Sequence, residues 1–186
     1  MKFKEQLSFV GYFLVTGVLA TITMDMTALT MVKSGIIHLG DFQIVPSLLG
    51  RWVGYFPAGI FFHSTILETQ PLAHERLIGI LSHNLIGVTL TTLVVYPHVL
   101  IWRQKIAPGT AVLFGICTCL FPYFVMFPAM GFGVMGLKLA HASLLLSFSA
   151  FNHAAFGAGI FVWSNLLFKP FSSWSGVALC RPAIVE

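Results

Sequence analysis

The sequence predicts an all-α integral membrane protein: a four-helix transmembrane bundle with an interfacial loop between the first and second helices. Only 9% of the 186 residues are charged and 57% are hydrophobic, whereas a soluble domain carries roughly 25% charged residues. Four apolar stretches are long enough to cross a bilayer, which takes about 20 residues in a helix. Because none of them alternates strictly between polar and apolar residues, helices are expected rather than the strands of a barrel.

The predicted helices lie near residues 7–32, 77–102, 110–134 and 142–168 of one transmembrane domain, residues 1–170. Residues 171–186 form a C-terminal tail without a recognisable motif. The N-terminus, MKFKEQLSFVGYFLVTGVLA, has the charge and apolar core of a signal peptide. However, VLA is a poor cleavage site and the apolar run continues beyond it, so we expect an uncleaved signal anchor.

The connection between the first and second spans is unusually long for a compact domain. It contains VPSLLGRWVGYFPAGIFF, which is apolar and aromatic but is broken by Pro46 and Pro57. We expect this stretch to lie in the membrane interface or to re-enter the membrane edge. Trp52 and Tyr55 are natural interface anchors, because amphipathic rings are enriched at the headgroup level.

The distribution of Lys and Arg predicts the orientation of the chain. With four spans, both termini share one side with the turn at 103–109, and this side holds Lys2, Lys4, Arg103, Lys105, Lys169 and Arg181. The opposite side holds Lys33, Arg51, Arg76 and Lys138, spread over a much longer stretch. The positive-inside rule therefore predicts cytoplasmic termini and an external long loop.

Three ionisable residues lie deep inside the predicted spans: Asp25, His83 and His153. At a rise of 1.5 Å per residue they lie roughly 12, 9 and 16 Å from the outer surface, so one layer of the membrane is expected to contain all three. Ionisable residues in a span are costly and usually mark a functional or paired site. The sequence thus predicts an outward-facing polar pocket, with further candidate residues near its mouth: Glu75, Arg51, His63 and Trp52.

Each of these ionisable residues also belongs to a row with a step of four residues. The rows are Gly17, Thr21 and Asp25; Glu75, Gly79, His83, Gly87 and Thr91; and Ser149, His153 and Gly157. Residues four apart share a helix face, and small residues there let two helices approach closely. The rows predict that the polar residues face protein. HNLIG and HAAFG also share H-x-x-x-G, which suggests a two-plus-two repeat.

The third predicted span contains PYFVMFPAMGFG, in which two prolines interrupt the helix. Pro122 removes the backbone donor for the carbonyl of Thr118, and Pro128 removes the donor for Phe124. A freed carbonyl in lipid needs another partner, so this stretch is expected to be buried or to line a cavity.

The sequence leaves three interpretations of the Asp/His cluster open. It is a hydrogen-bonded contact that holds helices together, a proton or ion relay or ligand cavity, or a metal site. The candidate metal ligands are His83, His153 and Asp25, and two histidines are also a pattern for haem. The cofactor stays unknown, and the expectation is that there is none.

Other function classes lack a sequence signal. No basic block or basic helix face fits nucleic acid, and no nucleophile elbow, Walker motif or dinucleotide fingerprint occurs, so no enzymatic activity is assigned. The cysteines Cys117, Cys119 and Cys180 give no disulfide framework. The expected partner is the lipid bilayer, and a second copy of the chain or another membrane protein is a further candidate.

Five motifs follow one another in a familiar order: ATITMD, LLGRWVGYFPAGIFFH, HERLIGILSHNLIG, PYFVMFPAMGFG and NHAAFGAG. With them, residues 15–168 of the chain resemble the small bacterial membrane proteins grouped as domain of unknown function 2938. The resemblance implies a multi-pass protein of the bacterial inner (plasma) membrane and implies no activity. It emphasises Asp25, Gly50, Arg51, Trp52, His63, Glu75, Arg76, His83, Pro128 and His153.

The function expected from these observations is that of a small transport-type or ligand-binding membrane protein with an outward-facing Asp/His pocket. Two alternatives remain at this point. One is a membrane-embedded enzyme or redox subunit that binds a metal or haem on the histidines. The other is an accessory subunit of a larger membrane complex, whose polar row packs against a partner.

Overall fold

The computed structural model describes residues 3–35, 45–102 and 104–168. Within these ranges the regular structure is helical throughout and no strand occurs. Four helical stretches are long and apolar enough to cross a membrane: Val10–Lys33, Glu75–Val99, Pro108–Ala129 and Ala142–Leu167. The prediction of four membrane-capable helices is confirmed. The predicted tail, together with Lys2, Arg103, Lys169, Cys180 and Arg181, lies outside the described residues.

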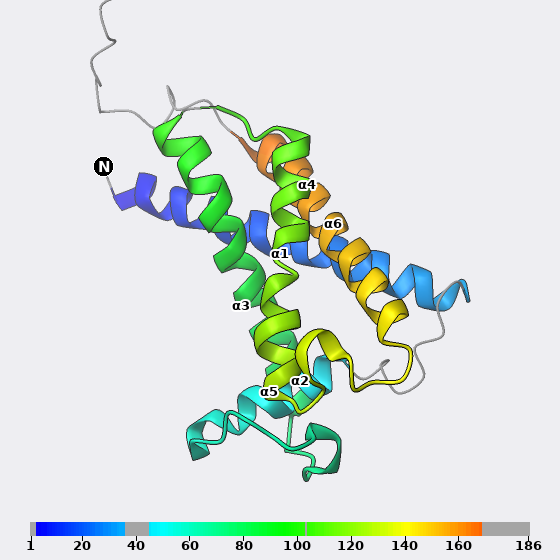
Figure 1. Ribbon diagram of the computed structural model, residues 1–186. Coiled ribbons are helices and arrows are strands. Elements are labelled where there is room, and N and C mark those ends of the chain that lie inside the picture. Colours follow the sequence, from blue (N-terminus) through cyan, green and yellow to red (C-terminus); the bar gives the residue numbers. More distant parts are fainter. Residues whose placement is uncertain (1–2, 36–44, 103, 169–186) are drawn as a thin grey trace, which may run out of the picture.

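Four long elements build the bundle: α1 (Phe3–Lys33), α3 (Glu75–Tyr96), α4 (Pro108–Cys117) and α6 (Ala142–Leu167). Helix α1 packs against both α3 and α6, and α6 packs against both α1 and α4. In Figure 1, α1 passes behind α3 and α4 at a wide angle to both. The four helices therefore contact one another in the order α3, α1, α6 and α4.

Small residues lie at the points of closest approach. A Cβ added to Gly87 of α3 would overlap the hydroxyl of Thr21, and one added to Gly17 would lie 2.5 Å from the Cα of Val88. In the same way, a Cβ on Gly157 of α6 would overlap the carbonyl of Ala111 in α4. The predicted rows of small residues thus lie in the helix contacts, where they let the backbones approach closely.

Buried side chains form two separate clusters. One joins α1, α3, α4 and α6 and includes Phe13, Ala20, Val95, Val99, Ala111, Phe156 and Ile160. The other joins the long connection to the second half of the chain and includes Leu49, Trp52, Ile66, Cys119, Tyr123, Phe127 and Leu145. Along α6, His153 lies between Leu145 and Phe156, so it occupies the level between the two clusters.

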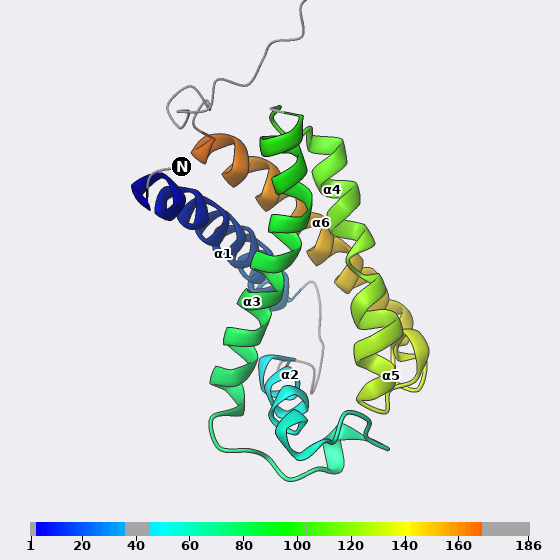
Figure 2. The same cartoon turned by 90° about the vertical axis from the view of Figure 1, so that its left-hand side faces the viewer.

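The long connection folds into a helix that the sequence analysis did not predict, α2 (Val45–Gly54). Pro46 lies in its first turn, where a missing N–H breaks no helical hydrogen bond, and Pro57 lies beyond its end in the 3₁₀ turn η2 (Phe56–Ala58). The two prolines therefore bound a helix. Helix α2 packs along the start of α3, as Figure 2 shows, and the turn η3 (Ile66–Glu68) follows.

The third span is interrupted as its prolines predicted, and it is shorter than expected. Helix α4 ends at Cys117, and the π-helical turn η5 (Pro122–Met126) leads into a last short turn, α5 (Phe127–Ala129). The predicted continuation to residue 134 is wrong, because Gly131 takes φ +87° directly after α5, a conformation that ends a helix. The Thr118 carbonyl accepts the N–H of Phe121 at 3.2 Å, so the group freed by Pro122 has a partner.

Candidate functional site

The contact between α1 and α3 brings Asp25 and His83 together. Thr21 of α1 meets Gly87 of α3, and one helical turn further along each antiparallel helix stand Asp25 and His83. The Nδ1 atom of His83 lies 3.5 Å from the Oδ1 atom of Asp25, with 33% and 47% of the two side chains exposed. A carboxylate and an imidazole from two membrane-capable helices thus lie within ion-pair distance, and both side chains are partly exposed.

The hydroxyl groups around Asp25 are engaged with their own helix. Thr23, Thr27 and Thr30 each donate to the carbonyl four residues earlier, at 2.7–2.8 Å. These hydroxyl groups therefore donate to the backbone of α1, whereas the carboxylate of Asp25 lies beside His83. The nearby Trp163 of α6 donates its Nε1–H to Thr23 at 3.0 Å, which ties this part of α1 to α6.

His153 has a different partner, Thr118 at the end of α4. The Nδ1 atom of His153 lies 2.6 Å from the hydroxyl oxygen of Thr118, and this hydroxyl in turn donates to the carbonyl of Gly115. The hydroxyl of Thr118 thus lies between the carbonyl of Gly115 and the ring of His153, and the tautomer of the ring decides whether Nδ1 donates to the hydroxyl or accepts from it.

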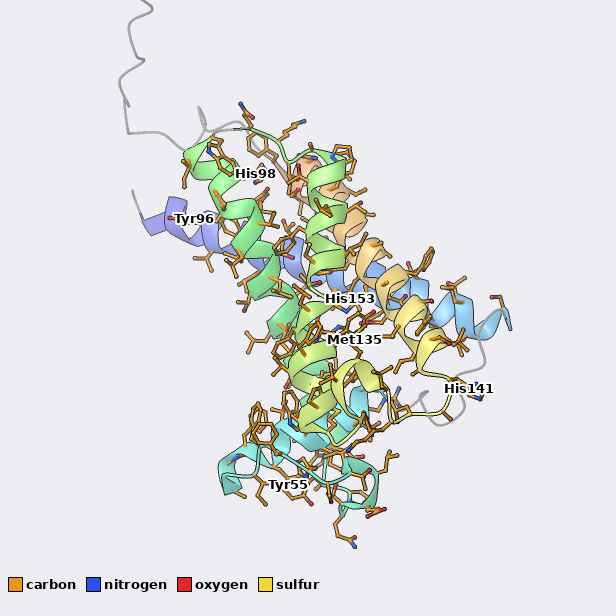
Figure 3. The ribbon with its side chains drawn as sticks, viewed as in Figure 1. Tyr55, Tyr96, His98, Met135, His141 and His153 are labelled. Carbon is orange, nitrogen blue, oxygen red and sulfur yellow. The ribbon has the colours of Figure 1, made fainter. Side chains whose placement is uncertain are left out.

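His153 lies on α6 six residues before Gly159, which packs against Ala20 and Thr23 of α1. Figure 3 shows His153 in the middle of the molecule, at the level where α1 passes behind α4 and α6. The structure thus gathers the three predicted intramembrane residues in one region. It pairs Asp25 directly with His83 and supports His153 separately through Thr118.

Arg51 and Glu75 form a second, much tighter pair between α2 and the start of α3. Arg51 Nε and Nη2 donate to the two carboxylate oxygens of Glu75 at 2.8 and 3.0 Å, and Arg51 Nη1 donates to the carbonyl of Thr69 at 3.1 Å. The hydrogen bonds to Glu75 raise the pKa of Arg51 further. Glu75 also accepts the N–H of Leu72 at 3.1 Å. Arg51 and Glu75 were expected near the mouth of a pocket, but their polar atoms bind each other and the neighbouring backbone.

Trp52 and His63 also support the long connection from within. Trp52 is buried and donates its Nε1–H to the carbonyl of Phe61 at 2.8 Å. The ring of His63 packs edge-on against Tyr55, with 5.3 Å between the centroids, and its buried Nε2 has no hydrogen-bond partner among the described residues. Burial lowers the pKa of His63. Trp52 and His63 thus both contact other residues of the long connection between α1 and α3.

A family model described as protein of unknown function (DUF2938) matches residues 14–167. The chain belongs to this family. No curated protein and no solved structure matches it. The DUF2938 match begins within the first membrane-capable helix and includes α2 and the other three, so both acid–base pairs lie within it.

The metal hypothesis gains no support from the geometry of the DUF2938 chain. Among the described residues, no three His, Cys, Asp or Glu side chains gather closely enough to hold a metal ion. A hollow of about 590 Å³ on α3, lined by Val88, Thr92, Tyr96 and Ile101 among others, contains none of the candidate residues.

Sequence reasoning missed two polar residues beside His153. Thr118 supports its ring, and Asn152 is buried on α6 with its Oδ1 unpartnered within the described chain. Asn152 offered a signal, since it directly precedes His153 in NHAAFG and an amide in a span is as conspicuous as a histidine. Thr118 offered only its position four residues before Pro122, which does not identify a partner on another helix.

Proposed function

We propose that this DUF2938 chain is a small transport-type or ligand-binding membrane protein whose Asp25–His83 pair takes up and releases a proton. The observation that carries the proposal is the geometry of that pair: a carboxylate and an imidazole from two spans, 3.5 Å apart and partly exposed. An imidazole changes charge close to neutral pH. Because the pair is neither buried nor fully hydrogen-bonded, protonation of either member changes its charge without breaking the fold.

Each residue then has a distinct role. Asp25 accepts the charge or the proton, and His83 is its titratable partner across the α1–α3 contact. His153, which is hydrogen-bonded to Thr118, is the second histidine of the site and a further acceptor.

We place the chain in the bacterial inner membrane, with both termini in the cytoplasm and the pair facing outward. The distribution of Lys and Arg supports this orientation.

Purified protein reconstituted in liposomes tests the proposal. A potassium gradient with valinomycin sets a membrane potential, and an enclosed pH-sensitive dye reports proton movement. We expect faster proton entry with the wild-type chain than in protein-free liposomes, and loss of the excess rate in Asp25→Asn and in His83→Gln. Glu68→Gln is the matched control, since Glu68 is an exposed acid outside the spans.

Two results contradict the proposal: wild-type liposomes no faster than protein-free ones, or an Asp25→Asn variant as fast as the wild type. A second role, helix packing, is favoured by the position of Asp25 at the end of the row that brings Thr21 against Gly87. If Asp25→Asn fails to accumulate in the membrane while Glu68→Gln accumulates normally, the packing role replaces the transport role.

A further inference from the structure

The segment after α2, YFPAGIFF at residues 55–62, exposes large apolar side chains. Phe62 is 74% exposed, and Phe56, Ile60 and Phe61 are exposed to a smaller extent. We call these four residues the aromatic tip. Aromatic and aliphatic surface of this kind is unfavourable in water and requires an apolar neighbour.

The aromatic tip is rigid. Phe56 stacks on Phe61 with ring centroids 5.0 Å apart, and both rings contact the buried Trp52, at 4.9 and 5.1 Å. The hydrogen bond from Trp52 to the carbonyl of Phe61 fixes the segment from below. An apolar surface that is already ordered loses little conformational entropy when it meets a partner.

Two contacts set the depth of the aromatic tip relative to the spans. The N–H of His63, the next residue after the tip, donates to the carbonyl of Ala129 at 2.8 Å, and Ala129 is the last residue of the third span. Arg51, at the other side of Trp52, binds Glu75, the first residue of the second span. The tip is therefore held at the level where two spans reach the membrane boundary.

The opposite edge of the same segment is polar. Tyr55 donates its hydroxyl to the carbonyl of Gln70 at 3.1 Å, and Figure 3 shows Tyr55 at the end of the molecule furthest from the crossing helices. Glu68, in the turn η3, is exposed as well. A polar edge that faces away from the spans and an apolar surface at their boundary are what a membrane interface requires.

We infer that the aromatic tip inserts into the outer leaflet and contacts lipid acyl chains just below the headgroups. The third span also exposes apolar side chains, Phe124 and Val125 among them, and its last residue, Ala129, accepts the N–H of His63 next to the tip. The inference rests on the proposed outward side and on membrane insertion of the spans, and it is independent of proton movement.

Spin labels on single cysteines test the inference in the full chain reconstituted in phosphatidylcholine–phosphatidylglycerol vesicles. The native cysteines are replaced by alanine, and labels are attached in Phe62→Cys, in Leu85→Cys as the reference for lipid, and in Glu68→Cys as the reference for water. Leu85 is highly exposed within the second span. Collisions with oxygen, which enters lipid, are compared with collisions with a water-soluble nickel chelate.

The ratio of oxygen to nickel collisions at Phe62→Cys is expected to approach that of Leu85→Cys and to exceed that of Glu68→Cys. A ratio equal to that of Glu68→Cys overturns the inference, because the tip then lies in water. Protection from both reagents also overturns it, because a second copy or another protein then covers the tip. If Leu85→Cys itself is accessible to nickel, membrane insertion fails, and the proposed function fails with it.

Discussion

Two acid–base pairs connect α3 to its neighbours, and they differ in almost every property. The Arg51–Glu75 pair has two short hydrogen bonds, and its side chains are only 10% and 15% exposed. The Asp25–His83 pair is separated by 3.5 Å, and its side chains are 33% and 47% exposed. Glu75 and His83 lie on the same row of α3, two turns apart, so the difference comes from the neighbouring helices and not from α3 itself.

The difference distinguishes a pair with several hydrogen bonds to the fold from a longer, partly exposed pair, and the second is the pair that we propose to change charge. Arg51 also donates to backbone carbonyls, and Glu75 also accepts a backbone N–H, so each charge has several partners. Removing either member leaves a buried charge behind. Asp25 and His83 form one long contact, and either can become neutral with little cost to the surrounding structure.

The largest expected effect comes from breaking the buried pair. Glu75→Leu leaves the guanidinium of Arg51 without its counter-ion, and we expect a loss of about 3–5 kcal/mol of stability. The double variant Arg51→Met/Glu75→Leu should recover part of this loss, because no buried charge remains. Thermal unfolding in detergent measures both. A Glu75→Leu variant as stable as the wild type would show that α2 does not depend on the pair.

A smaller effect is expected from separating α2 and α3 between the two pairs. A Cβ on Gly79 would overlap the carbonyl of Pro46, so Gly79→Ala must push the helices apart, at a cost of about 1–3 kcal/mol. Gly11→Ala is the control, since no atom lies within 4 Å of its added Cβ. Gly11→Ala should be neutral or stabilising in the same thermal unfolding experiment. Equal effects of the two substitutions would contradict the close contact of α2 with α3.

Neutralising the exposed pair should change stability less than either of these substitutions. Asp25→Asn removes a long, partly exposed contact, for which we expect a loss below about 1 kcal/mol. The measurement is the thermal midpoint of Asp25→Asn beside that of Glu75→Leu. If the two variants unfold at similar temperatures, Asp25 holds the helices together and the comparison between the pairs fails.

The smallest effect on stability is expected for His63, which lies in the long connection together with Arg51. Burial lowers the pKa of His63 in the folded chain, whereas in the unfolded chain it stays at about 6.5. Below that pH the unfolded chain binds more protons, so this contribution to stability falls as the pH decreases through 6.5. His63→Gln should therefore lose less stability than the wild type between about pH 7.5 and about pH 5.5, as measured by thermal unfolding. An identical pH response of both chains would contradict the burial of His63.

The interior of the bundle was more predictable than the long connection. The row Gly17, Thr21 and Asp25 and the row with His83 and Gly87 indicated which faces meet, and those faces are in contact. The connection contained no such row. Pro46 and Pro57 were interpreted as breaks, although they bound α2, and Arg51 was placed at a pocket mouth, although it binds Glu75.

The sequence by itself determined the four membrane-capable helices and the interruption at Pro122. These features depend on the number of consecutive apolar residues and on a missing backbone donor, both of which are local. Only the tertiary structure decided the partners: Glu75 for Arg51, Asp25 for His83 and Thr118 for His153. Each of these contacts joins different elements, and its geometry depends on how closely glycines let those elements approach.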